Sequence, residues 1–474
     1  MSRPGVDVGI LETPGSVVSQ PIDTGTAFWT GLTERGALGA HPVYSLDDFV
    51  TKYGQRVSYG TLYDSAQAFF REGGNKVYIS RVVGPTPTSG FKNLPDAGAV
   101  TSLVATAVGP GDWSGTIKVA VLTGTVGGTF IIQVTDASNN VLEDSGNLED
   151  QNSAILWSQS SGYIRLTLGA SANDPAVLAP VVLSTGTDDR NNITDTQWAN
   201  ALAMFTTDLG PGQVSAPGRT TTTAHQQLIA HVEANDRVAL LDLTDSNSVA
   251  TLSSNADNSR FAAAFAPWVQ VPGLVAGSVR VIPASAVIAG MIARNDPGLG
   301  TNHPAAGRFG ASNYAIGVSQ NPFTDAQRDQ LNNAGVNVIR VLAGTVTNYG
   351  WRSTTDPTSD SNWIDFGNAR LFMKLTAELN QVGQNWLFEE IDGQNGRTIG
   401  GFHDSLVSVL LRHYNMGELF GDTADAAFQV DTGTSVNTLE TIANMELHAI
   451  CYVKMSPFAE YVEIRIVKRA VQEV

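Results

Sequence analysis

The residues best placed to do chemistry in this sequence are one acid at the end of a strand and one pair of adjacent acids. Asp242 lies at the end of a predicted strand over 237–243, and α/β enzymes place reactive groups at such carboxyl ends. Glu389 and Glu390 could act as a general acid and a general base. Adjacent residues point to different sides, however, and no third group completes a site, so a solvated turn is the better interpretation of the pair.

The histidines do not have the spacing of a metal site. His225 and His231 lie six residues apart, and His403 and His413 lie ten apart. A zinc-binding helix needs two histidines at positions i and i+4 with a glutamate between them. We therefore expect solvated or capping histidines and no metal.

Phosphate-binding motifs are also missing. The dipeptide Gly-Lys, which a Walker loop requires, occurs nowhere, and no Gly-x-Ser-x-Gly sequence is present. The glycine-rich run 109–115 leads into a predicted strand rather than a helix, so its backbone N–H groups cannot form a phosphate cradle, and a plain turn is favoured. We expect no cofactor and no enzymatic activity.

Composition excludes further classes of protein. The chain has 474 residues, too many for one core, and a formal net charge of −17. Because Lys468-Arg469 is its only basic run, we expect no direct nucleic-acid binding. No run of about 18 apolar residues predicts a membrane span, and no signal peptide pattern opens the chain. The single cysteine, Cys451, excludes an intramolecular disulfide, fits a reducing compartment and is expected in the core.

The elements that organise the chain lie at its ends. Residues 461–467 alternate strictly between apolar and polar side chains, as a half-buried strand does. A second alternating run, 447–455, precedes it, and we expect the two to be adjacent strands. One face of the closing strand is formed by Val462, Ile464 and Ile466.

The opposite end of the chain also predicts an isolated strand. Residues 4–14 place Val6, Val8 and Ile10 on one side of an extended segment that has no hairpin partner nearby. Such a strand needs an edge from elsewhere, and a terminal strand can find one on another molecule. We therefore expect a subunit that polymerises by lending strands.

Between the ends, the sequence predicts several domains. Strand, helix, helix and strand patterns follow one another over 26–83, which is typical of an α/β layer. From 85 to 190 the patterns become β-rich, turn-rich and acidic, which indicates a surface insertion. The expected parts are an arm (1–20), a mixed α/β domain (21–84 and 191–320), an all-β insertion (85–190) and a C-terminal α+β domain (321–474) with a terminal strand arm.

Several segments resemble the contractile phage tail sheath protein family. They include P-G-V-D-V, A-F-W-T-G-L-T-E-R-G-A-L and F-F-R-E-G-G-N-K-V-Y-I-S-R-V before the insertion. After it come V-I-P-A-S-A-V-I-A-G-M-I-A-R-N-D, L-N-N-A-G-V-N-V-I-R, N-W-L-F-E and P-F-A-E-Y-V-E-I-R-I. Each motif alone is short, but their shared order covers most of the chain outside 85–190.

The resemblance implies a structural subunit that polymerises as stacked six-fold rings around an inner tail tube, together with baseplate and tail terminator proteins. In that family both arms complete a sheet in neighbouring subunits, and the sheath contracts to drive the tube through a cell envelope during genome delivery. A virion tail, assembled in the host cytoplasm, is the implied location.

Two alternatives stay open. Within the family, the chain could belong to a tail-like bacteriocin or an injection system. In another class, it could be an α/β enzyme that uses Asp242 and carries a β-rich carbohydrate-binding insertion.

Overall fold

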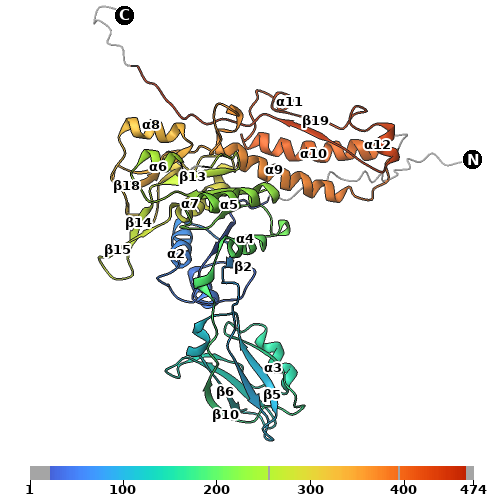
Figure 1. Ribbon diagram of the computed structural model, residues 1–474. Coiled ribbons are helices and arrows are strands. Elements are labelled where there is room, and N and C mark those ends of the chain that lie inside the picture. Colours follow the sequence, from blue (N-terminus) through green and yellow to red (C-terminus); the bar gives the residue numbers. More distant parts are fainter. Residues whose placement is uncertain (1–21, 255–256, 393–395, 466–474) are drawn as a thin grey trace, which may run out of the picture. The chain divides into compact units, whose positions relative to one another are not determined.

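The chain folds into two compact units, which are described separately. A computed structural model describes residues 22–254, 257–392 and 396–465. The larger unit contains residues 23–296 and 305–366. The smaller unit contains the described residues of 1–22, 297–304 and 367–474. Figure 1 shows the elements of both units.

An eight-stranded sheet forms the centre of the larger unit, in the order β18-β17-β13-β12-β11-β1-β3-β2. The inner six strands pair in parallel, and β2 and β18 add to the edges in antiparallel fashion. The strands are β1 (Ala27–Gly31), β2 (Ala40–Val43), β3 (Val77–Arg81), β11 (Gln213–Ser215), β12 (Val238–Asp242), β13 (Ala262–Ala266), β17 (Val336–Leu342) and β18 (Thr345–Asn348).

The central strands β12 and β13 are almost continuous apolar runs because helices and loops bury both of their faces. Every residue of β1, β12 and β13 is buried. The helices of this unit are α1 (Leu46–Tyr53), α2 (Leu62–Glu72), α4 (Asp195–Ala203), α5 (Thr222–Ala234), α6 (Val249–Ser254), α7 (Ala284–Leu299, whose last residues enter the smaller unit) and α8 (Asp325–Asn333). A small sheet combines β14 (Val269–Pro272), β15 (Val279–Ile282) and β16 (Gly317–Val318).

Local sequence signals set several helix ends. The Ser45 hydroxyl accepts a hydrogen bond from the Asp48 N–H and begins α1, as expected of an N-cap serine. Helix α2 ends at Gly73, whose φ of 108° is a conformation that glycine adopts without a Cβ clash. Thr324 caps α8 through a capping box with Gln327.

The β-rich insertion folds around a core of its own. Two antiparallel sheets, in the orders β4-β5-β9 and β10-β6-β7-β8, enclose a separate apolar cluster. The strands are β4 (Phe91–Pro95), β5 (Thr101–Ala107), β6 (Lys118–Thr123), β7 (Phe130–Thr135), β8 (Val141–Asp144), β9 (Ile164–Leu168) and β10 (Leu178–Val182). One helix, α3 (Gln151–Ser158), is capped by Asp150 and was not expected from the sequence.

Two long helices and a two-stranded sheet form the smaller unit. Helices α9 (Phe366–Asn385, whose first residue belongs to the larger unit) and α10 (Arg397–Asn415) lie side by side, with β19 packed on α10 (Figure 1). Strand β19 (Phe428–Asp431) pairs with β20 (Ile450–Val453), and the short helices are α11 (Ala424–Ala427) and α12 (Leu439–Ala443).

Two sequence expectations differ from the structure. The chain does not divide at 321, because β17 pairs with β13 and thereby keeps 305–366 in the larger unit. The closing strand does not pair beside 447–455 either. Residues 461–465 form no strand in this chain, and β20 pairs with β19 instead.

Candidate functional site

Asp242, the acid that an enzyme would use, has a structural role. Its carboxylate accepts hydrogen bonds from the Ser285 N–H (2.8 Å), the Ser285 hydroxyl (2.6 Å) and the Gly218 N–H (3.1 Å). Burial raises the pKa of Asp242, and these hydrogen bonds act in the opposite direction. The side chain is 2% exposed and caps the first turn of α7. Its position at a strand end serves packing, which argues against the enzyme alternative.

The expectation of solvated or capping histidines is wrong for His225 and His413, because both are fully buried. His413 Nε2 lies 2.7 Å from a carboxylate oxygen of Glu378, and its Nδ1 contacts Glu418. Arg412 also contacts Glu378, at 2.5 Å. This buried charge cluster lies in the smaller unit, and its partners are 35 and 5 residues away from His413 in the sequence.

The electrostatics of the buried charge cluster favour a charged imidazolium. Burial opposes charging of His413, but its hydrogen bonds to Glu378 and Glu418 raise its pKa. Burial likewise opposes ionisation of the two glutamates, and contact with His413 lowers the pKa of each. The cluster thus pairs the side chains of His413 and Arg412 with two carboxylates inside the unit.

The buried charge cluster also fixes backbone near both chain ends. Glu418 accepts a hydrogen bond from the Thr301 N–H at 2.6 Å through a side-chain oxygen, and its carbonyl accepts one from the Ser456 N–H at 3.0 Å. The Ile22 N–H lies 3.4 Å from a Glu378 carboxylate oxygen. The segments that lead to the two arms therefore both begin next to this cluster.

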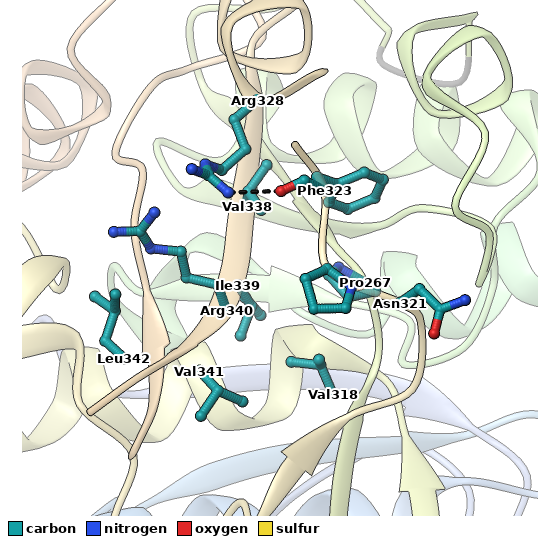
Figure 2. Close-up of a pocket in the computed structure, with 11 residues that line it drawn as sticks. Pro267, Val318, Asn321, Phe323, Arg328, Val338, Ile339, Arg340, Val341 and Leu342 are labelled. Atoms are coloured by element: carbon teal, nitrogen blue, oxygen red, sulfur yellow. Dashed lines mark hydrogen bonds between the residues drawn. The ribbon is translucent and has the colours of Figure 1, made fainter. Parts of the chain in front are cut away.

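A pocket of about 140 Å³ lies beside β17 in the larger unit. Figure 2 shows that its lining residues are mostly apolar, with the side chains of Arg328 and Arg340 among them. Arg328 donates to the Phe323 carbonyl oxygen at 2.6 Å and so holds the chain before α8 in place. No acid, histidine or nucleophile lines this pocket.

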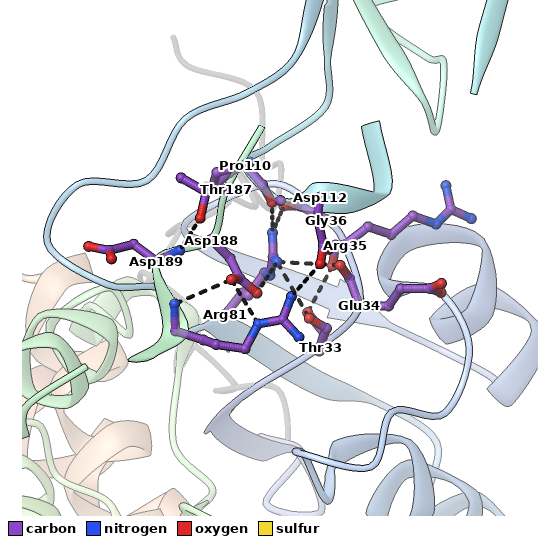
Figure 3. A network of polar contacts seen from close by, with 12 residues as sticks. Thr33, Glu34, Arg35, Gly36, Arg81, Pro110, Asp112, Thr187, Asp188 and Asp189 are labelled. Carbon is purple, nitrogen blue, oxygen red and sulfur yellow. Dashed lines mark hydrogen bonds and ion pairs between the residues drawn. The ribbon is translucent and has the colours of Figure 1, made fainter. Parts of the chain in front are cut away.

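A network of polar contacts surrounds Arg81 at the base of the insertion (Figure 3). The guanidinium donates to the carbonyl oxygens of Gly36 (3.2 Å) and Pro110 (2.6 Å) and pairs with Asp188 at 3.7 Å. Burial lowers the pKa of Arg81 to about 10, although Asp188 acts in the opposite direction. Arg81 thus links the α/β sheet to both the interior and the end of the insertion.

The glycine-rich run 109–115 has its explanation in the same place. Gly109 has a φ of 108°, and a Cβ there would lie 2.0 Å from the Gly36 carbonyl oxygen. Only glycine allows this close approach of the two backbones. The following residues form a short 3-10 helix, Asp112–Thr116, before β6.

The sheet of β19 and β20 is the best candidate for a binding site. Its two strands have four residues each, and no third strand pairs with them among the described residues. One face packs on the helices through the expected alternation of Leu447, Ala449, Cys451, Val453 and Met455. On the other face, Ile450 and Tyr452 are 43% and 54% exposed. The outer edges of the two strands carry unpaired backbone N–H and C=O groups, which suit added strands.

The closing segment has exposed apolar side chains, as a donated strand would. Val462 and Ile464 are 72% and 82% exposed. Ile466 lies outside the described residues, as do Val6, Val8 and Ile10 of the amino-terminal arm. Of the six apolar side chains that the alternation predicts for the two arms, Val462 and Ile464 are described, and both are exposed in the single chain.

Metal-binding clusters and membrane-spanning helices are both absent from the described ranges. No group of three or more histidine, cysteine or acidic side chains there could hold a metal ion. None of the helices described is both long and apolar enough to cross a membrane.

Comparisons with known proteins give a match in structure rather than in sequence. No family model matches the chain, and no curated protein matches it closely enough to count as a relative. Solved structures do match. The sheath complex of a PVC extracellular contractile injection system in its contracted state is 15% identical, with a TM-score of 0.60 over 100% of this chain and 99% of the other.

Two more solved sheath structures match this chain in fold. The contracted helical sheath of the anti-feeding prophage is 16% identical, with a TM-score of 0.58 over 99% of this chain and 100% of the other. A sheath tail protein from Listeria innocua is 12% identical, with a TM-score of 0.61 over 88% of this chain and 90% of the other. The mixed, multidomain α/β and α+β architecture is thus confirmed, and the chain has the fold of contractile sheath proteins.

Proposed function

We propose that this chain is the sheath subunit of a contractile tail, a structural protein without enzymatic activity. The observation that carries the proposal is the match in fold to three sheath proteins over 88–100% of the chain. The two compact units and the insertion all fall within the matched length. The use of Asp242 as a helix cap supports a structural rather than a catalytic role.

The subunits polymerise by strand addition. Both arms leave the smaller unit and enter neighbouring copies, where their backbones pair with the open edges of β19 and β20. Main-chain hydrogen bonds provide strength, and the alternate side chains fix the register. Val6, Val8 and Ile10 form the inward face of one arm, and Val462, Ile464 and Ile466 form that of the other. Contacts of this head-to-tail kind propagate into a helix rather than closing in a pair.

The polymer is a six-fold helical sheath around an inner tail tube, with a baseplate at one end and a terminator at the other. It contracts and drives the tube through a cell envelope. Better burial between subunits in the short state supplies the work, so no nucleotide is needed. A phage tail, which delivers a genome from the virion, is the first candidate.

An injection system is the second candidate, because a specific observation favours it. The injection-system and anti-feeding prophage sheaths are matched over 99–100% of both chains, whereas the Listeria sheath tail protein is matched over 88% of this chain. A gene for a capsid next to the gene for this chain would favour the phage tail, and its absence from the whole cluster would favour the injection system.

The test of the proposal is assembly of the purified chain. Electron microscopy should show tubes, and Val8→Asp or Ile464→Asp should block them, because a buried unpaired carboxylate costs several kcal/mol in every subunit. Asp7→Ser and Glu463→Gln on the opposite faces are the matched controls and should assemble like the parent. If the parent forms only monomers with inner tube and baseplate present, the chain is not a sheath subunit.

A further inference from the structure

Besides the sheet of β19 and β20, the smaller unit has an apolar groove that an added strand alone would not cover. A groove of about 760 Å³ lies between the end of α9, the start of α10 and the chain after α12. We call it the tip groove. It is lined by Asn380, Gly383, Gln384, Trp386, Leu387, Phe388, Glu389, Glu390, Ile391, Phe402, Ile442, Met445 and Leu447.

Two residues of the tip groove combine an exposed apolar side chain with an unfavourable backbone conformation. Phe388 and Met445 are 102% and 89% exposed, which is rare for large apolar residues. Both also have left-handed backbones, with φ of 68° and 63°. Such a backbone costs about 1–2 kcal/mol for a residue with a Cβ. Neither burial nor local hydrogen bonding of these side chains offsets that cost in the single chain, so a partner that covers them is expected.

The tip groove also contains a buried hydrogen-bond donor that has no acceptor among the described residues. The Trp386 ring packs against Phe402, with ring centroids 6.1 Å apart. Its Nε1–H is buried and has no hydrogen-bond partner within the described part of the chain. A carbonyl oxygen of an incoming chain would satisfy this donor.

The charge at the edge of the tip groove restricts the choice of partner. Glu389 and Glu390 are both exposed and form no ion pair with any described residue. A matching segment must combine apolar side chains with two adjacent cations. In this chain of net charge −17, adjacent cations occur once, at Lys468-Arg469, within the sequence I-V-K-R-A-V-Q-E-V of residues 466–474.

The direction of the strands brings this segment to the tip groove. Strand β20 runs from Ile450 to Val453, so its first residue lies three positions after Leu447, which lines the tip groove. A strand that is added to β20 in antiparallel fashion therefore leaves the sheet at the Ile450 end. If 461–467 of a neighbour pair in this way, the next residues reach the tip groove, since each extended residue spans about 3.3 Å.

We propose that the tip groove binds residues 468–474 of a second copy of this chain, with Lys468 and Arg469 facing Glu389 and Glu390. The inference rests on the proposed strand addition and adds a contact that holds the donated strand in one register. Apolar residues of the tail cover Phe388 and Met445, while the charge pairs fix the register, because a two-residue slip would place an apolar side chain opposite the acids.

The test uses a labelled peptide of residues 457–474 and the purified full chain, with binding measured by fluorescence anisotropy. We expect saturable binding that falls about tenfold in the Glu389→Lys, Glu390→Lys chain, the scale of close charge pairs across an interface. A peptide with Lys468→Glu and Arg469→Glu should bind this reversed chain about as well as the parent peptide binds the parent chain. Asp422→Lys with Asp425→Lys, outside the tip groove, is the control and should bind like the parent.

A second variant tests the cost of the left-handed backbone. Phe388→Gly removes the ring together with the unfavourable conformation, so the free chain should unfold at the same temperature or higher while peptide affinity falls about tenfold. Equal peptide affinity of the parent, reversed and Phe388→Gly chains would overturn the proposal, as would no binding at all. Tube formation is scored separately: tubes without charge-dependent peptide binding would refute only the tip groove, whereas absence of tubes would refute the proposed function.

Discussion

Replacing His413 with glutamine should destabilise the smaller unit far more than the same substitution at an exposed histidine would. The imidazole contacts Glu378 and Glu418, whose side chains are 0% and 1% exposed. Glutamine keeps polar atoms but removes the positive charge, so among the described residues Glu378 keeps its ion pair with Arg412 and Glu418 keeps only Lys374, at 4.0 Å. Removing one partner of a buried ion pair costs about 3–5 kcal/mol.

Hydrogen exchange of α9 and α10 is the suitable assay, because a chain with two units does not unfold in one step. The exchange rates of peptides from these two helices report the opening free energy of the smaller unit alone. His403→Gln is the control, since His403 is partly exposed and pairs only with Asp404, at 3.1 Å. It should change stability by less than about 0.5 kcal/mol. A loss below about 1 kcal/mol in His413→Gln would refute the assigned role of the cluster.

The same cluster gives a pH dependence with a definite sign. The pKa of His413 is raised in the folded chain, so its contribution is complete below the unfolded pKa of about 6.5 and is lost as pH rises through the folded value. The pKa values of Glu378 and Glu418 are lowered, so their contribution is lost as pH falls through those values. Protection of α9 and α10 in the parent should therefore decline as the pH rises from about 6.5 through the folded pKa of His413, and this decline should be absent in His413→Gln.

Two further predictions concern the larger unit. Replacing 90–185 with a short Gly-Ser linker should leave tubes intact, as seen by electron microscopy. The two ends of the insertion already lie together, because the Gly84 N–H donates to the Asp188 carbonyl oxygen at 2.8 Å. A folded variant that fails to assemble would show that the insertion takes part in assembly. Asp242→Ala should lower the opening free energy of β12 and α7, measured by hydrogen exchange, by about 2–3 kcal/mol, since it leaves buried donors of Ser285 and Gly218 unpaired. No loss would contradict the capping role.

Local signals in the sequence predicted much of the fold. The end of α2 at Gly73, the Ser45 and Thr324 caps and the half-buried alternation of 447–455 all depend on neighbours within a few residues, so a local reading of the sequence can find them. The start of α10 at Arg397 could not be predicted in this way, because Gly400 and Gly401 disfavour a helix. The structure gives the reason for Gly401: a Cβ there would lie 2.5 Å from the Trp386 ring.

The roles of buried polar residues could not be predicted in this way. Asp242 meets Ser285 across 43 residues, and His413 meets Glu378 across 35, so neither spacing resembles a local motif. The tip groove was missed for a similar reason. Glu389 and Glu390 were interpreted as a solvated turn, and nothing nearby in the sequence indicates that Met445 lies beside them.

The shortness of β19 and β20 has a consequence for when assembly begins. An edge of four residues offers few main-chain hydrogen bonds, so one donated strand on its own is held weakly, and short edges protect a free subunit from aggregation. In the proposed sheath, a finished ring would instead present many such edges at a fixed spacing, and an incoming subunit that engages two of them would gain a high effective concentration for the second. Nucleation in solution should therefore be slower than growth on an existing ring, so tubes of the purified chain should appear after a lag and then lengthen quickly.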